Sequence, residues 1–244
     1  ELDGLLRVQC PRKIETQIRK LRRQEGRIGE PRFFNSSFSM HAKPNGIGTK
    51  RELGGRTLFD LGVYCINAAR LLFRAEPTEV FAYSIDGARA DMPEIDEMTS
   101  GVMRFDGDRL ATFTTSFAAD GVSDLRVVGT EGSIQAEPAY EYAEALGYTL
   151  TVGDQVKKKK GRRRDQFAAE LVYFSDCVLN GKDPEPSAEE GCWDVRVAAA
   201  LYESARIGAP VALPQFGPER LPSRQQAHDL PPVQEPELIA VVKP

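Results

Sequence analysis

Alternation of apolar and polar residues dominates the middle of the chain and predicts a run of β-strands. In residues 31–40, Phe34, Ser36, Phe38 and Met40 recur at every second position and would share one face of a strand. Similar stretches follow at residues 78–85, 98–105, 109–117, 124–128, 132–136 and 148–152. Because turns such as Asp106-Gly107-Asp108 are too short for a crossover, these strands must pair antiparallel. The pattern predicts one open, mainly antiparallel sheet.

Helical spacing of apolar residues precedes this sheet. A short strand over residues 5–9 is expected to lead into a helix that begins at Pro11. Gly26 would end that helix, and its buried positions are Ile14, Ile18 and Leu21.

Two further helices and a last strand are expected after the sheet. Asp165 would cap the first helix, whose inner side would be formed by Phe167, Leu171, Phe174 and Val178. A capping box from Ser187 to Glu190 would begin the second helix, whose buried stripe is Trp193, Val197 and Leu201. A last strand is expected within residues 210–213. Helices on one face of an open sheet make an α+β fold, and the other face needs cover because a bare sheet leaves a large apolar patch.

The composition changes after residue 213. Seven of the 16 prolines lie within residues 214–244, and large apolar residues are few there before Leu238-Ile239-Ala240-Val241-Val242. The chain therefore divides into an α+β domain over residues 1–213 and a Pro-rich extended tail over residues 214–244. The terminal apolar block leaves two alternatives open, a disordered tail or a tail wrapped over a neighbouring surface.

Charge and cysteine content exclude several classes of protein. The net charge of −4 favours neither nucleic acid nor a membrane surface as partner, and no apolar run approaches the roughly 20 residues that span a bilayer. The four cysteines are Cys10, Cys65, Cys177 and Cys192, widely separated and accompanied only by His41 and His228. This spacing predicts no metal site, and it indicates buried free thiols in a reducing, cytoplasmic compartment.

One stretch is strongly basic. Residues 157–164 carry seven Lys or Arg side chains in eight positions. Such a block can bind nucleic acid, but no aromatic residue is interleaved for base stacking. Because the run falls between an expected strand and an expected helix, it predicts a solvated loop.

The residues after Gly54-Gly55 are the main candidates for chemistry. This turn leads into a helical pattern over residues 57–73, with the Thr57 hydroxyl as the expected N-cap. Asp60 and Tyr64 are four residues apart, so they stack on one helix face and can touch a common ligand. Spacing alone also fits a polar pair that faces solvent.

The same stretch resembles a known family. Gly54-Gly55 followed by Asp60-Leu61-Gly62-Val63-Tyr64 is similar to the Gly-rich turn and Asp-x-Gly-x-Tyr helix of the glucose–fructose oxidoreductase/inositol dehydrogenase (Gfo/Idh/MocA) oxidoreductases. The resemblance covers roughly residues 5–213 and continues through Ile28-Gly29-Glu30-Pro31, Asp96-Glu97-Met98, Arg164-Asp165-Gln166-Phe167 and Glu189-Glu190-Gly191. It implies the C-terminal, substrate-side domain of such an enzyme, which is like the C-terminal domain of glyceraldehyde-3-phosphate dehydrogenase, without the N-terminal Rossmann domain. In one departure, Arg56 stands where the family has a third glycine.

The resemblance implies roles for particular residues. Tyr64 would be the catalytic acid/base and Asp60 would bind or orient the substrate. A tyrosine, whose ordinary pKa is about 10, needs a nearby cation to act as a base. In the family this cation is the lysine of a Glu-Lys-Pro motif, which the 244 residues lack. Expected substrate contacts are Arg51, Gly54, Gly55, Asp96, Glu97 and Gln166, although Asp96 and Glu97 fit backbone contacts equally well.

The resemblance also implies partners. NAD or NADP would be the cofactor of the complete enzyme, but no Gly-x-Gly-x-x-Gly follows a strand, so we expect no tight binding to this chain alone. A homo-oligomer formed through the open sheet face and a small sugar substrate are expected as well.

Two functions remain open. One is the substrate-binding portion of an NAD(P)-dependent oxidoreductase that acts on the CH-OH group of a sugar or cyclitol. The other is a non-catalytic binding or assembly module, derived from that family after loss of the nucleotide-binding domain. The Asp60–Tyr64 pair favours the first, whereas Arg56 and the missing lysine favour the second.

Overall fold

The computed structural model describes residues 21, 26–44, 46–86, 95–142, 144–163, 165–184 and 187–214. The expected strand over residues 5–9, the tail from residue 215, Cys10 and His228 lie outside these residues. Of the helix expected after Pro11, only Leu21 is described, and it is fully buried as predicted.

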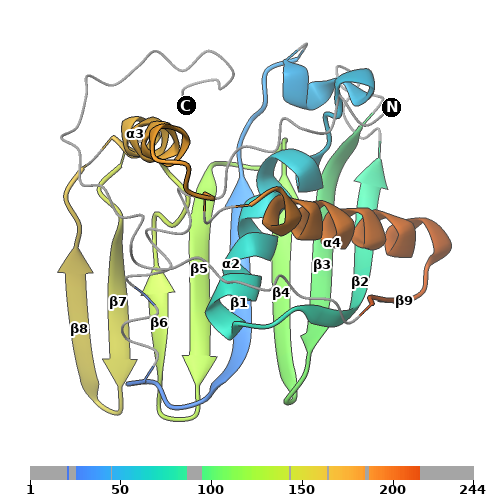
Figure 1. Cartoon of the computed structure of the whole chain (residues 1–244). Coiled ribbons are helices and arrows are strands. Elements are labelled where there is room, and N and C mark those ends of the chain that lie inside the picture. The colour runs from blue at the N-terminus through green and yellow to red at the C-terminus, as the bar shows by residue number, and fades with distance from the viewer. Residues whose placement is uncertain are drawn as a thin grey trace.

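A nine-stranded sheet organises the described part of the chain (Figure 1). Its order is β8-β7-β6-β5-β1-β4-β3-β2-β9. Only β1 and β4 run parallel, and every other neighbouring pair is antiparallel. The predicted open, mainly antiparallel sheet is confirmed. The strands are β1 (Pro31–Ser39), β2 (Pro77–Asp86), β3 (Asp96–Phe105), β4 (Arg109–Ser116), β5 (Val122–Gly129), β6 (Gly132–Ala136), β7 (Gly147–Val152), β8 (Gln155–Lys160) and β9 (Val211–Ala212).

Alternation along each strand decides which side chains enter the core. In β3, Gly101, Met103 and Phe105 are buried, whereas Val102 and Arg104 are exposed on the other face. A side chain at Gly101 would place its Cβ 2.8 Å from the ring of Phe113, so glycine here lets that ring pack on the sheet.

Helices α2 and α4 cover the same face of the sheet (Figure 1). A π-helical turn, Leu58–Gly62, leads directly into α2 (Val63–Phe73), and all 11 residues of α2 are buried. Helix α4 (Ala188–Ile207) buries Trp193, Val197 and Leu201, as the sequence predicts. The hydrophobic core lies between these two helices and the sheet.

A buried cluster of charges joins α2 to α4. Arg70, whose side chain is 1% exposed, forms an ion pair with Asp194, two hydrogen bonds of 2.6 and 2.8 Å with Glu76, and a 3.2 Å contact with Glu190. Burial opposes the charge of Arg70, but the three carboxylates outweigh burial and raise its pKa. The side chain of Asn67 donates to Asp194 at 2.9 Å. The predicted cap of α4 is present, since Ser187 accepts from the Glu190 amide at 3.2 Å.

The four lysines of the basic run, residues 157–160, lie in a strand, so our prediction of a loop was wrong for them, whereas residues 161–163 lie in no strand. Residues Gln155–Lys160 form β8, which pairs with β7 through a tight turn at Gly153, where φ is 54°. All six residues of β8 are exposed. An edge strand tolerates consecutive lysines because their charge discourages pairing with another sheet, so a run that reads as a loop can still complete a hairpin.

Helix α3 (Gln166–Leu179) faces the opposite way from our prediction. Asp165 caps it as expected, accepting from the Ala168 amide at 2.9 Å. However, the four residues predicted to be inside are exposed by 46, 67, 54 and 66%: Phe167, Leu171, Phe174 and Val178. Tyr173 and Cys177 are buried instead. The helix is apolar on both sides, so periodicity alone could not identify the inner one.

The thiols follow the prediction only in part. Cys65 and Cys177 are buried and free, but Cys192 is free and exposed. Helix α4 presents Cys192 on the side away from Trp193 and Val197, which explains why a residue type that is usually buried remains accessible. Within the described residues, no helix combines the length and the apolar character that crossing a bilayer would require.

Candidate active site

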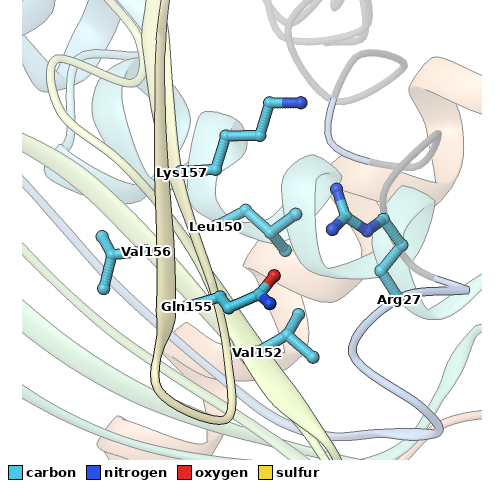
Figure 2. Close-up of a pocket in the computed structure, with 6 residues that line it drawn as sticks. All are labelled: Arg27, Leu150, Val152, Gln155, Val156 and Lys157. Carbon is cyan, nitrogen blue, oxygen red and sulfur yellow. The ribbon is translucent and has the colours of Figure 1, made fainter.

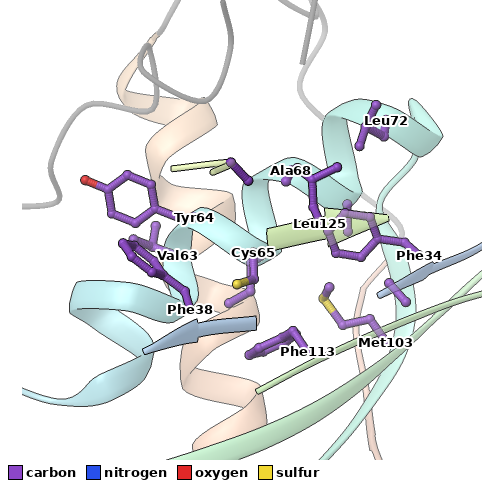
Figure 3. Close-up of a cluster of buried hydrophobic side chains, with 14 of the residues drawn as sticks. Phe34, Phe38, Val63, Tyr64, Cys65, Ala68, Leu72, Met103, Phe113 and Leu125 are labelled. Carbon is purple, nitrogen blue, oxygen red and sulfur yellow. The ribbon is translucent and has the colours of Figure 1, made fainter. Parts of the chain in front are cut away.

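The first turns of the helical segment carry the two predicted catalytic residues. Asp60 lies in the π-helical turn and is half-buried, whereas Tyr64 is the second residue of α2 and is 6% exposed. Figure 3 shows the Tyr64 hydroxyl pointing away from the buried cluster, while its neighbour Cys65 points into it. π-Helical turns occur often at functional sites, which makes this segment a natural place for a ligand.

An aromatic frame holds the ring of Tyr64. Phe38 of β1 meets it edge-on, with centroids 5.4 Å apart and planes at 84°, and Tyr140 lies 6.0 Å away. Phe38 and Tyr140 are themselves 5.1 Å apart, so the three rings form one group. Such contacts restrict the rotamers of Tyr64 and fix the direction of its hydroxyl.

Tyr140 is anchored by Ser36. The Ser36 hydroxyl donates to the Asp124 carbonyl at 2.7 Å, and because it has one hydrogen, it accepts from the Tyr140 hydroxyl at 2.6 Å. The Cys65 sulfur lies 3.3 Å from the Ser36 hydroxyl. Burial raises the pKa of Cys65 to about 12, against the hydrogen bonds of Ser36 and Tyr140, so this thiol stays protonated at neutral pH.

Asp60 faces the loop that precedes it. A Cβ at Gly48 would lie 2.7 Å from the Asp60 carboxylate and 3.8 Å from the ring of Phe117. Gly48 belongs to the 3-10 turn Ile47–Thr49, and the backbone here therefore approaches the carboxylate as only glycine allows. The loop and the helix meet at Asp60, which is where a polar ligand would have carboxylate and backbone together.

Asp96 holds the start of the helical segment. It is fully buried, and its carboxylate accepts from the Thr57 amide at 3.3 Å, the Thr99 hydroxyl at 2.8 Å and the Tyr202 hydroxyl at 3.0 and 3.2 Å, as well as from the Thr57 hydroxyl. The Thr57 hydroxyl makes no capping bond, so the predicted N-cap is wrong. A carboxylate from β3 replaces it, because its full charge binds the helix N-terminus more strongly than a hydroxyl does.

Arg56 contacts the same group of residues around Asp96. Its guanidinium lies over the ring of Tyr202, 4.2 Å from the centroid, and its Nε lies 4.0 Å from the Asp96 carboxylate. Tyr202 also accepts from the Leu58 amide at 2.9 Å, and burial together with Asp96 raises its pKa well above the usual range. The long side chain at the third-glycine position is thus bound by protein groups.

The other predicted site residues are spread around this centre. Arg51 is exposed in the 3-10 turn Arg51–Leu53, Gly54 ends that turn with φ of 80°, and buried Gly55 donates to the Lys50 carbonyl at 2.9 Å. Glu97 is half-buried, and its carbonyl accepts from the Phe117 amide at 2.9 Å. Gln166 is the first residue of α3, and its side chain lies outside the described residues.

A separate concavity lies at the far hairpin. It measures about 400 Å³ and is lined by Arg27, Leu150, Val152, Gln155, Val156 and Lys157. Figure 2 shows Arg27 facing the β7–β8 hairpin across it. None of the predicted site residues lines it. Among the described residues, no group of three or more His, Cys, Asp and Glu side chains is arranged to hold a metal ion.

A model of a known protein family matches the part of the chain that contains Asp60 and Tyr64. Residues 17–135, which include the Gly-Gly turn, the π-helical turn, α2 and Asp96, match the family model described as the GFO/IDH/MocA C-terminal domain. The chain belongs to the GFO/IDH/MocA family. It carries the C-terminal domain of that family, as the sequence resemblance implies.

Two relatives within the GFO/IDH/MocA family are D-xylose dehydrogenases. The chain is 28% identical over 223 residues to D-xylose 1-dehydrogenase [NADP(+)] of Haloarcula marismortui, a match that covers 87% of this chain and 61% of that protein. It is 30% identical to D-xylose 1-dehydrogenase (NADP(+)) 2 of Haloferax volcanii, covering 73% of this chain and 54% of the relative. The chain thus spans little more than half the length of these relatives.

Solved structures show the same fold. The crystal structure of aldose-aldose oxidoreductase from Caulobacter crescentus, complexed with glycerol, superposes with a TM-score of 0.73 at 26% identity. That match covers 83% of this chain and 61% of the other. The predicted α+β fold with an open sheet is confirmed by this likeness.

Sequence reasoning missed the residues that support the site. The supporting side chains come from four separate parts of the chain: Tyr202 from α4, Thr99 from β3, Tyr140 from a loop and Ser36 from β1. None of them is close to Asp60 or Tyr64 in the sequence. A single tyrosine or serine forms no pattern, so the sequence cannot distinguish a residue that supports the site from an ordinary core residue. Only the pairing of the strands places them there.

Proposed function

We propose that this chain is the substrate-binding portion of an NAD(P)-dependent oxidoreductase that acts on the CH-OH group of a sugar or cyclitol. The observation that carries the proposal is the placement of Asp60 and Tyr64 on a helical segment that contacts neighbouring groups on three sides. The Asp96 cluster fixes its start, the aromatic frame fixes Tyr64, and Gly48 brings the loop backbone onto Asp60. Similarity to two D-xylose dehydrogenases supports the same substrate class.

The residues divide the chemistry between them. Tyr64 exchanges a proton with the oxygen atom of the reacting carbon, taking it from the hydroxyl on oxidation and returning it on reduction. Asp60 accepts a hydrogen bond from a neighbouring sugar hydroxyl and so orients the ring. The aromatic frame excludes water from one side of Tyr64 and holds its hydroxyl in a single direction.

The residues of this chain do not form a dinucleotide site by themselves. A nicotinamide cofactor supplies hydride transfer, and its pyrophosphate binds a Gly-rich turn at a helix N-terminus. The sequence contains no such Gly-x-Gly-x-x-Gly, and the buried start of the α2 segment is already satisfied by Asp96 and Tyr202. Any cofactor of the complete enzyme would therefore be held mainly by other polypeptide.

Sugar binding tests the proposal directly. In a saturation-transfer NMR titration with D-xylose and a panel of aldoses and cyclitols, we expect selective binding by the native chain. Asp60→Asn should weaken it about tenfold, because a charge-assisted hydrogen bond to the sugar is lost. Tyr64→Phe should retain the fold and lose a hydroxyl contact.

A matched control is Asp106→Asn, in an exposed hairpin turn, which should leave the affinity unchanged. If no sugar binds to a chain that unfolds cooperatively, or if Asp60→Asn binds as well as the native chain, the proposal is wrong.

The second candidate is a non-catalytic binding or assembly module. It is favoured by the absence of a Glu-Lys-Pro lysine from the 244 residues and by Arg56, whose guanidinium binds Tyr202 and Asp96 in place of a third glycine. Sugar binding that survives Tyr64→Phe and Asp60→Asn together would support this function over the first.

The face of the sheet opposite helices α2 and α4, which no other described helix covers, is our proposed surface for self-association (Figure 1). Phe33, Tyr83, Val102 and Leu110 are exposed on it, and Phe33 lies beside Leu110 in the β1–β4 pairing. Burying such side chains against a second copy is favourable, since each contributes about 1.5 kcal/mol or more. We expect a dimer in sedimentation velocity that Leu110→Lys converts to monomer, whereas Ile207→Lys, at the exposed end of the helix α4 that covers the other face, does not. A native chain that is monomeric at micromolar concentration would contradict this proposal.

A further inference from the structure

Helix α3 presents an apolar stripe to solvent. The stripe consists of Phe167, Leu171, Phe174 and Val178, at a spacing of four, three and four residues, with exposures of 46, 67, 54 and 66%. Val172 and Leu179 extend it, at 47 and 84%. Exposed apolar side chains are normal when scattered, but a continuous row along one helix marks a contact surface.

The opposite side of α3 already has its partners. Tyr173 and Cys177 are buried against the domain, and at the start of the stripe itself Phe167 also contacts Tyr142, at a centroid distance of 5.7 Å. The helix is therefore docked, and the α3 stripe cannot turn inward without exposing the residues that hold it. The occupant of the stripe must come from elsewhere.

We propose that the apolar block Leu238-Ile239-Ala240-Val241-Val242 of the same chain docks on the α3 stripe. Within residues 215–244 this is the only run of five consecutive apolar residues. Five residues in extended form span about 17 Å, and the 14 residues of α3 span about 21 Å, so the two match in length.

The intervening chain is long enough to reach the stripe. Residues 215–237 separate the block from the described end of the domain and contain five prolines: Pro218, Pro222, Pro231, Pro232 and Pro236. At about 3.1 Å per residue in an extended, Pro-rich conformation, this connection spans roughly 70 Å. A domain of this size has a radius of gyration of about 17 Å, so every point of its surface lies within reach.

Other occupants fit the stripe less well. A second copy could pair α3 with α3, but 14 residues make only two heptads, which is less than the three or four that sustain a coiled coil. The open sheet face competes for the apolar block, yet its exposed apolar side chains are separated by polar ones, such as Asn35, Ser100 and Thr112. A narrow, continuous stripe is the better match for a short extended segment.

Hydrogen exchange of the full-length chain tests this docking. The double variant Ile239→Asp/Val241→Asp places charges in the apolar block and leaves the domain unchanged. We expect amide exchange across residues 167–179 to rise at least tenfold, together with increased binding of the dye ANS. Val233→Asp, which alters a lone apolar residue of the tail, is the matched control and should change neither.

Each outcome separates the alternatives. Unchanged exchange of α3 in the double variant overturns the proposal. Protection of α3 that disappears on dilution of the native chain, and that the double variant does not affect, assigns the stripe to a second copy. Exchange that rises only over the strands assigns the block to the sheet face. Because the readout involves no sugar, it is independent of the function proposed above.

Discussion

Replacing Arg70 by methionine is expected to destabilise the protein by about 3–5 kcal/mol, the usual loss when one partner of a buried ion pair is removed. Methionine fills much of the volume but leaves Glu76, Glu190 and Asp194 without the cation that all three contact. Their mutual repulsion and their burial then act unopposed between α2 and α4. Urea unfolding at neutral pH measures the loss, and Arg206→Met is the control, since that arginine forms only an exposed ion pair with Glu203.

The loss of unfolding free energy caused by Arg70→Met, its stability deficit, should become smaller as the pH is lowered. Burial already raises the pKa of Asp194 in the native protein, while Arg70 lowers it, so removing the cation raises the value further. A carboxyl group with a higher pKa in the folded than in the unfolded chain binds more protons when folded, and its stability contribution is lost as pH rises through the folded value. The deficit is therefore largest at about pH 7 and smaller toward about pH 5. A deficit that does not depend on pH would show that the carboxylates are not its cause.

Asp96→Ala is expected to cost about 3 kcal/mol and to loosen the segment that carries Asp60 and Tyr64. The substitution removes a buried acceptor shared by Thr57, Thr99 and Tyr202, and leaves the buried donors of Thr57 and Thr99 without it. It also removes the negative charge at the start of the helical segment. Urea unfolding measures the stability, and exchange of the amides of Thr57 and Leu58 reports on the local opening.

Asp124→Ala is the matched control for that variant. Asp124 also lies in a strand, but it is only partly buried and accepts from the Ser37 amide at 3.1 Å. We expect it to lose about 1 kcal/mol, with no faster exchange at Thr57 or Leu58. If Asp96→Ala were no more costly than Asp124→Ala, Asp96 would not be the group that fixes the helical segment.

The sheet was largely predictable because its strands alternate and its turns are short. Strand β6 has the predicted limits, the other predicted strands differ by one or two residues at their ends, and β8 was not predicted. The order of the strands was not predictable. Nothing in residues 31–40 indicates that β1 lies between β4 and β5, since those partners are chosen by packing across the whole sheet.

The errors arise where local pattern and tertiary context disagree. In α3, apolar residues occur on both sides, and the side that packs was decided by the position of the helix at the end of β8 rather than by the larger stripe. In β8, charge suggested a loop, but a Gly153 turn and a free sheet edge were enough to form a strand. Propensity is a weak guide at an edge, where few contacts oppose the side chains.

The site was predictable as a motif and not as a structure. Asp60 and Tyr64 follow from the Gly-Gly turn and the resemblance, and their catalytic role stays a prediction. The surroundings come from residues distant in sequence: Tyr202 is 144 positions from the Leu58 amide that it binds, and Tyr140 is 104 positions from Ser36. The periodicity of apolar residues carries no information about contacts between residues so far apart in the sequence.

The central place of β1 has a consequence for the way the chain folds. Phe34 pairs with Ala111 and Val127, 77 and 93 positions further along, whereas β2–β3–β4 and β5–β6–β7–β8 are two meanders, in which each strand pairs with the next one along the chain. Strand β1 is synthesised before its partners β4 and β5. Pairing each of them with β1 requires closing a long loop, which costs conformational entropy. Either meander can form early. The continuous sheet on which α2 packs is complete only when β1 is inserted between β4 and β5, although β1 precedes both of them along the chain.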